Sequence, residues 1–293
     1  MKRKLLIALS MLLAALLIFS VSVLIYKNQK EKESAESNAL AHELVHLPEL
    51  VPSPSPVLSH ESVPTELPQQ EIQTETEPET VVIDRPLRDA YAEALADTDL
   101  GPLREVNGDV MGWIEIPDTR ISYPLLQCGN NDYYLSHSWQ KWDNPAGAIF
   151  LEFQNAPDFS DFNTLIYGHR MNSGDMFGTL YMFSEQEYLD AHPRIYIVDD
   201  SGCRVYEIFA SYEVTVDSRI YAMNFSNDVY KQAYIDHCLE LSHVESDAEL
   251  DPGDNIITLS TCSRASGKNY RYIVQAVYLG TVPRSQTPGQ ELS

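Results

Sequence analysis

A long uncharged segment near the N-terminus is the feature that most constrains this chain. Residues 5–26 contain no charged side chain, and at about 1.5 Å of helical rise each they match the thickness of a bilayer core. The segment therefore predicts a transmembrane helix. Basic residues precede it, at Lys2, Arg3 and Lys4, and predict a cytoplasmic N-terminus with the rest of a single-pass membrane protein outside the cell. The alternative is a cleaved signal peptide, because Ser20-Val21-Ser22 places small residues after an apolar run.

Composition divides the remaining residues into three parts. After an anchor of residues 1–30, residues 31–83 are rich in proline and glutamate and contain almost no aromatic residues. Such a segment cannot bury a core, so it predicts a disordered, extended stalk, with an interaction tail as the alternative. Residues 84–281 have a globular pattern and predict one folded domain. The polar residues 282–293 predict a flexible tail.

Charge and cysteine content disfavour two kinds of function. The formal net charge of -23 disfavours binding to nucleic acid. Four cysteines occur without the spacing of a zinc site, which disfavours a structural metal, although one or two disulfides remain possible. We expect Cys203 and Cys238 to be small buried residues, since Cys238 continues an apolar stripe along a predicted helix. Cys128 lies in a predicted loop, and its role stays open.

The folded domain is predicted to be mainly β. Eight short β-rich segments separated by turn residues indicate an antiparallel or mixed barrel more than a βαβ array. They are residues 113–116, 120–126, 148–152, 164–167, 194–198, 204–212, 255–260 and 272–279. Two short helices are predicted before them, from about residue 86 to 95 and from 103 to 107. A longer helix is predicted at residues 228–242, among the late strands.

Three residues at predicted strand ends are candidates for catalysis. Cys262 ends an apolar strand and is followed by a polar run with cations, which favour the reactive thiolate. His169 ends another apolar strand, so both groups could meet on one rim of a barrel and form a Cys/His pair. Arg271 opens the last strand and could stabilise an oxyanion, with Arg264 as the competing candidate.

Each of these residues has a structural interpretation when taken alone. A cysteine after a strand is commonly a packing residue, and an arginine at a strand start is commonly a surface charge. A membrane-tethered binding module with Cys262 in its core is therefore an alternative, and it predicts that this thiol resists alkylation. A papain-like hydrolase is disfavoured because its cysteine precedes its histidine, whereas here His169 comes first.

Several strings of residues, in order along the chain, resemble the motifs of the sortases. Three of them are similar to the sortase histidine, cysteine and arginine motifs: Tyr167-Gly168-His169, Thr258-Leu259-Ser260-Thr261-Cys262 and Arg271-Tyr272-Ile273-Val274. Five further stretches resemble class B sortases, at residues 107–117, 123–127, 131–135, 147–151 and 176–180. The resemblance spans residues 97–280. It implies an eight-stranded sortase barrel with N-terminal helices and a helix between the sixth and seventh strands.

The resemblance also implies a cysteine transpeptidase that anchors surface proteins. In sortases the thiolate attacks a Thr carbonyl of a C-terminal sorting signal, and an amine, commonly from a cell-wall precursor, takes the acyl group. A pilin-polymerising sortase, which uses a lysine of another protein, is the alternative. The family needs neither metal nor cofactor.

The resemblance assigns roles to seven residues. Cys262 is implied as the nucleophile, His169 as the proton donor to the leaving amine, and Arg271 as the oxyanion stabiliser. Four residues match positions that line the substrate groove: Asn131, Leu135, Ser260 and Thr261. Class B members often have an acidic residue soon after the cysteine, whereas residues 263–266 are basic or neutral here. The sorting motif and the acceptor amine are therefore left undefined by the sequence.

Overall fold

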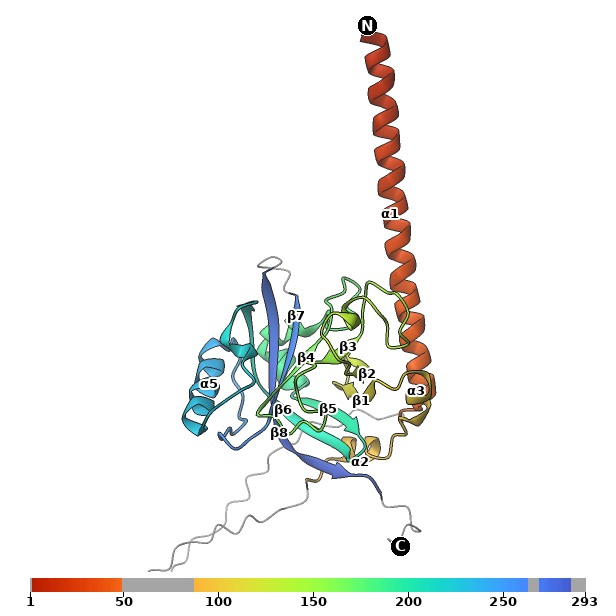
Figure 1. The fold of residues 1–293 in the computed structure, drawn as a ribbon. Coiled ribbons are helices and arrows are strands. Elements are labelled where there is room, and N and C mark those ends of the chain that lie inside the picture. The colour runs from red at the N-terminus through yellow and green to blue at the C-terminus, as the bar shows by residue number, and fades with distance from the viewer. Residues whose placement is uncertain (1, 49–86, 263–268, 286–293) are drawn as a thin grey trace, which may run out of the picture.

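The computed structural model describes residues 2–48, 87–262 and 269–285. Within these residues, eight strands form a closed barrel in the spatial order β1-β2-β3-β4-β7-β8-β6-β5 (Figure 1). The pairs β2–β3 and β4–β7 are parallel and the others antiparallel, which confirms the predicted mixed barrel. The strands are β1 (Val110–Glu115), β2 (Ser122–Leu126), β3 (Ile149–Leu151), β4 (Asn163–Tyr167), β5 (Arg194–Asp199), β6 (Gly202–Thr215), β7 (Ile256–Cys262) and β8 (Tyr270–Pro283).

Helices lie outside this barrel. The short helices α2 (Ala90–Leu95) and α3 (Gly101–Val106) precede β1, and α5 (Asp228–Leu241) lies between β6 and β7, as predicted. Asp89 caps α2 by accepting hydrogen bonds from the N–H groups of Tyr91 and Ala92. A further helix, α4 (Gln186–Ala191), is too short for sequence periodicity to predict. Three 3-10 turns complete the described elements: η1 (Tyr133–Leu135), η2 (Leu180–Ser184) and η3 (Arg219–Tyr221).

The main core fills the barrel interior. One cluster of buried residues receives side chains from all eight strands, for example Ile114 of β1, Ile166 of β4 and Leu259 of β7. Alternate residues point outward, so Ile256 belongs to a second cluster beneath α5. Each fully buried aliphatic side chain contributes roughly 1.5–3 kcal/mol, and this two-sided burial holds the register of β7.

The N-terminal helix extends further than the sequence predicts. α1 (Lys2–Val45) is one continuous helix, and its last turns pack against the barrel with Ala41 and Val45 buried (Figure 1). The predicted stalk from residue 31 therefore differs from the structure over residues 31–45. The physical reason is local composition, because residues 27–45 contain neither proline nor glycine and Pro48 is the first helix breaker. Residues 49–83 of the predicted stalk lie outside the described residues.

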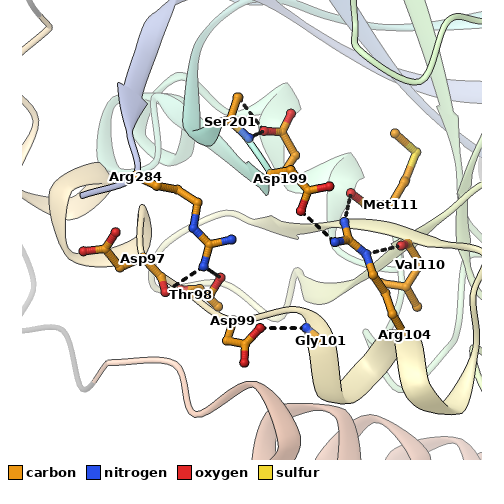
Figure 2. A network of polar contacts seen from close by, with 11 residues as sticks. Asp97, Thr98, Asp99, Gly101, Arg104, Val110, Met111, Asp199, Ser201 and Arg284 are labelled. Atoms are coloured by element: carbon orange, nitrogen blue, oxygen red, sulfur yellow. Dashed lines mark hydrogen bonds and ion pairs between the residues drawn. The ribbon is translucent and has the colours of Figure 1, made fainter. Parts of the chain in front are cut away.

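Arginines hold the end of the barrel near α2 and α3. Arg284 Nη2 donates to the carbonyl oxygens of Asp97 and Thr98, at 3.2 and 3.1 Å (Figure 2). Arg104 of α3 donates to the carbonyls of Val110 and Met111. β8 thus stays ordered to residue 283, two residues into the predicted tail, and most of that tail, residues 286–293, lies outside the described residues.

Candidate active site

The parallel pairing of β4 with β7 brings two of the predicted catalytic residues to one rim. In this register Tyr167 lies opposite Ser260, so His169 and Cys262 each come two residues further along neighbouring strands. The N–H of Gly168 donates to the carbonyl of Ser260 at 3.2 Å. This bond keeps the two strands together beyond the last ladder pair. Neighbouring strands lie about 4.8 Å apart, so the backbones of both residues share one edge of the barrel.

The third predicted residue joins the same edge through β8. Arg271 is the direct partner of Cys262 in the antiparallel β7–β8 ladder. Its guanidinium Nη1 donates to the carbonyl of Tyr270 at 3.0 Å. The three residues are far apart in sequence, and the strand order β4-β7-β8 brings their backbones together. The structure describes only the backbone of Cys262.

Hydrogen bonding defines the state of the His169 ring. Its Nε2 lies 2.7 Å from the carbonyl oxygen of Leu135. A carbonyl oxygen only accepts, so Nε2 carries a proton, and in the neutral ring Nδ1 is the basic nitrogen. Gly147 allows this approach, because a Cβ there would lie 3.0 Å from His169 Cδ2. The backbone carbonyl of His169 accepts from the N–H of Phe177, which fixes the chain after β4.

The four predicted groove residues lie in different environments. Leu135 is exposed beside His169, and Asn131 is partly buried on the same loop. Ser260 and Thr261 are buried in β7, where the Ser260 hydroxyl is 3.0 Å from the Tyr221 hydroxyl. Contact of any of the four with substrate remains a prediction.

Comparison with known proteins identifies the fold. A family model described as the sortase domain matches residues 114–279, more than half of the chain. Sortase B of Listeria monocytogenes is 39% identical over 166 residues, covering 56% of this chain and 67% of that protein. The chain belongs to the sortase family, in class B. Sortase B of Staphylococcus aureus is 30% identical over 172 residues, covering 59% of this chain and 70% of that protein.

A solved structure agrees with this assignment. The Staphylococcus aureus sortase B–substrate complex superimposes with a TM-score of 0.58 at 30% identity, covering 60% of this chain and 82% of that one. The chain is thus a sortase transpeptidase, of the family that attaches surface proteins bearing sorting signals to an amine acceptor.

Two of the cysteines of this class B sortase have the structural role that the sequence predicts. Cys203 and Cys238 are fully buried, in the cluster beneath the N-terminal helices and the cluster beneath α5. Burial raises the pKa of both thiols, so both stay protonated and unreactive near neutral pH. Cys128 is partly exposed, and its thiol lies 3.2 Å from the carbonyl of Asn130.

A buried carboxylate beside Asn131 is a residue that sequence reasoning missed. Glu152 is only 5% exposed, and its Oε2 accepts from Asn131 Nδ2 at 2.5 Å and from the Tyr167 hydroxyl at 2.9 Å. Burial, and then the nearby Glu152 charge, raise the pKa of Tyr167, which therefore stays a neutral donor. Asn131 Oδ1 in turn accepts from the N–H of Phe153. Glu152 thus orients the Asn131 amide through this hydrogen bond. Its only sequence signal is an acidic residue directly after an apolar strand.

Two substitutions of Glu152 distinguish the loss of its hydrogen-bond acceptor from the loss of its charge. Glu152→Ala is expected to leave two partly buried donors, Asn131 Nδ2 and the Tyr167 hydroxyl, without this acceptor and to destabilise the domain by about 1–3 kcal/mol. It should also lower kcat/KM by roughly tenfold, since Asn131 loses its orienting partner. Glu152→Gln retains an acceptor oxygen, so it should lose clearly less stability and less kcat/KM than Glu152→Ala. Thermal unfolding and steady-state kinetics of the two variants test this, and equal behaviour of the alanine variant and the unmodified protein would contradict the positioning role.

Proposed function

We propose that Cys262 is the nucleophile of this sortase, His169 the proton donor and Arg271 the oxyanion stabiliser. The observation that carries the proposal is the β4-β7-β8 register, which brings the backbones of the three residues to one rim. It is supported by the sortase domain match, which includes all three positions. Asn131, Leu135, Ser260 and Thr261 are proposed to line the substrate groove.

The proposed reaction has two acyl-transfer steps. The Cys262 thiol gives its proton to Nδ1 of His169, and the resulting thiolate attacks the carbonyl carbon of a Thr in a C-terminal sorting signal. Arg271 stabilises the negative oxygen of the tetrahedral intermediate. The C–N bond then breaks, the leaving amine takes a proton from His169, and a thioester with Cys262 remains. An acceptor amine attacks the thioester, gives a proton to His169, and releases the thiolate. One peptide bond breaks and one amide bond forms, without an oxidant, metal or cofactor.

The proposed location is the cell membrane, with the catalytic domain outside the cell. The described part of the chain has one helix long and apolar enough to cross a bilayer, and the basic residues lie before its apolar segment. The proposed partners are surface proteins with a sorting signal and a cell-wall precursor that supplies the amine. In this arrangement donor and acceptor both reach the enzyme at the outer membrane surface.

Product analysis tests this function. The full-length enzyme in vesicles is incubated with a panel of sorting-signal peptides and with two acceptors, a peptidoglycan-stem amine and a pilin-derived lysine peptide. We expect cleavage after Thr and an amide to the cell-wall amine, identified by mass spectrometry. Transfer to the pilin lysine alone would indicate the pilin-polymerising alternative. If no combination of peptide and acceptor gave either hydrolysis or transfer, the proposal would be contradicted.

A further inference from the structure

The loop next to the membrane end of α1 has an exposed tryptophan. Residues 137–144 form a short loop that is closed by a β-bridge between His137 and Asp143. Inside it, the N–H of Ser138 donates to the carbonyl of Trp142 at 2.8 Å. The Trp142 side chain is nevertheless 64% exposed, whereas Trp113 and Trp139 are 0% and 4% exposed. An ordered loop that presents a tryptophan outward needs an explanation, because indole rings prefer buried sites or the interface between lipid and water.

This loop is bound to the juxtamembrane part of α1. Ser37 Oγ donates to Gln140 Oε1 at 2.7 Å, and Trp139 Nε1 donates to the Ser37 carbonyl at 2.8 Å. Nearer the membrane end of the helix, Lys30 Nζ lies 3.4 Å from the carbonyl of Asp143. These bonds lock the loop onto the helix along two turns, so the loop has a fixed height along α1.

That height is close to the end of the apolar segment. The uncharged run ends at Tyr26, and Lys30 is four residues further along the same unbroken helix. Four residues correspond to about 6 Å of rise, within the thickness of a lipid headgroup layer. With residue 26 at the edge of the hydrocarbon core, the Asp143 end of the 137–144 loop, beside Lys30, reaches the headgroups. The Gln140 end, bonded to Ser37, lies about 16 Å from that edge.

The catalytic rim is on the same side of the barrel. The loop follows η1, whose last residue Leu135 binds His169 through its carbonyl. In Figure 1, β7 ends and β8 begins on the side from which the N-terminal half of α1 projects, while α2 lies at the opposite end. The edge that carries His169 and Cys262 therefore faces the direction of the apolar helix.

We propose that the 137–144 loop rests on the lipid bilayer with Trp142 among the headgroups, so that the catalytic rim faces the membrane. The proposal rests on the proposed anchoring by α1. Its partner is the bilayer surface. The charges beside Trp142 are mainly acidic, since Glu33, Glu36 and Asp143 line this surface, Lys30 pairs with Glu33, and Lys141 pairs with Asp109. The indole, rather than attraction to anionic lipid, is therefore the principal contact. A membrane-facing rim favours substrates that are themselves attached to the membrane.

Quenching of tryptophan fluorescence tests the position of Trp142. The full-length protein is reconstituted in vesicles of phosphatidylcholine and phosphatidylglycerol whose acyl chains are brominated near the headgroup. The chain has three tryptophans, and the two buried in the domain serve as an internal reference. We expect bromolipid to quench the unmodified protein and Trp142→Phe to lose at least two thirds of that quenching. Equal quenching of both proteins, or quenching of neither, would overturn the proposal whether or not the enzyme proves active. Thermal unfolding of Trp142→Phe verifies its fold.

A rigid extension of α1 tests the orientation of the rim. Seven helix-forming residues inserted between Tyr26 and Lys27 would lift the domain by about 10 Å. Transfer from a lipid-attached sorting peptide should then fall roughly tenfold, while transfer from a soluble peptide stays the same. An equal effect on both substrates, or none on either, would contradict a membrane-facing rim. Inactivity of the unmodified enzyme toward both peptides would instead count against the proposed function, and the quenching result would stand separately.

Discussion

Replacing Cys262 with alanine is expected to abolish peptide transfer, with a loss of at least about 10³-fold in kcat/KM. The reaction needs a covalent thioester, and alanine has no atom that can form one. The fold should be retained, because the strand register around position 262 is made by backbone hydrogen bonds that alanine also forms. Activity is measured with a fluorogenic sorting peptide, and stability by thermal unfolding.

The other cysteines provide the control for this result. Cys128→Ala should keep nearly full activity, since Cys128 lies on a loop and is only partly buried. Cys203 and Cys238 should resist iodoacetamide in the native protein, because burial raises the pKa of both thiols. Alkylation that inactivates the enzyme should therefore map to Cys262 by mass spectrometry. Full activity of Cys262→Ala, or a Cys262 that resists alkylation, would instead favour a binding module.

The strands were predictable because each carries its own signal. Alternating or continuous apolar residues between turn formers indicate all eight, and only their ends differ, as for β6, which begins at Gly202 and ends at Thr215. The register was not predictable, because β4 and β7 are about 90 residues apart and their parallel pairing depends on the closure of the whole barrel. The sequence could therefore suggest that His169 and Cys262 share a rim, but the ladder was needed to place them.

Other features were missed for identifiable reasons. The hydrogen bond from His169 to the Leu135 carbonyl has no sequence signal, since a backbone carbonyl is present at every residue. The buried Glu152 follows an apolar strand, where an acidic residue usually indicates only a turn. For α1, average composition over residues 31–83 concealed a helix-forming stretch that continues until Pro48. The position of the first helix-breaking residue, more than the average composition of the segment, decides where that helix ends.

His169→Ala is expected to reduce transfer by roughly 10² to 10⁴-fold, because the leaving amine then departs without a positioned proton donor. The Nε2–H bond to Leu135 fixes the ring, so the proton moves through Nδ1, and a side chain without a ring nitrogen cannot replace it. The pH profile of kcat/KM should lose the limb that belongs to the imidazole. His237→Ala on α5 is the matched control and should keep its activity and pH profile.

Chemical rescue distinguishes proton transfer by His169 from a structural role. Imidazole added to His169→Ala should restore part of the activity in proportion to its concentration, because the alanine leaves space beside Leu135 for a small ring. Addition of imidazole to Cys262→Ala should restore nothing, since that variant lacks the atom that forms the thioester. Activity of His169→Ala within twofold of the unmodified enzyme, with an unchanged pH profile, would show that another group supplies the proton. The rim formed by β4, β7 and β8 would then need a different acid.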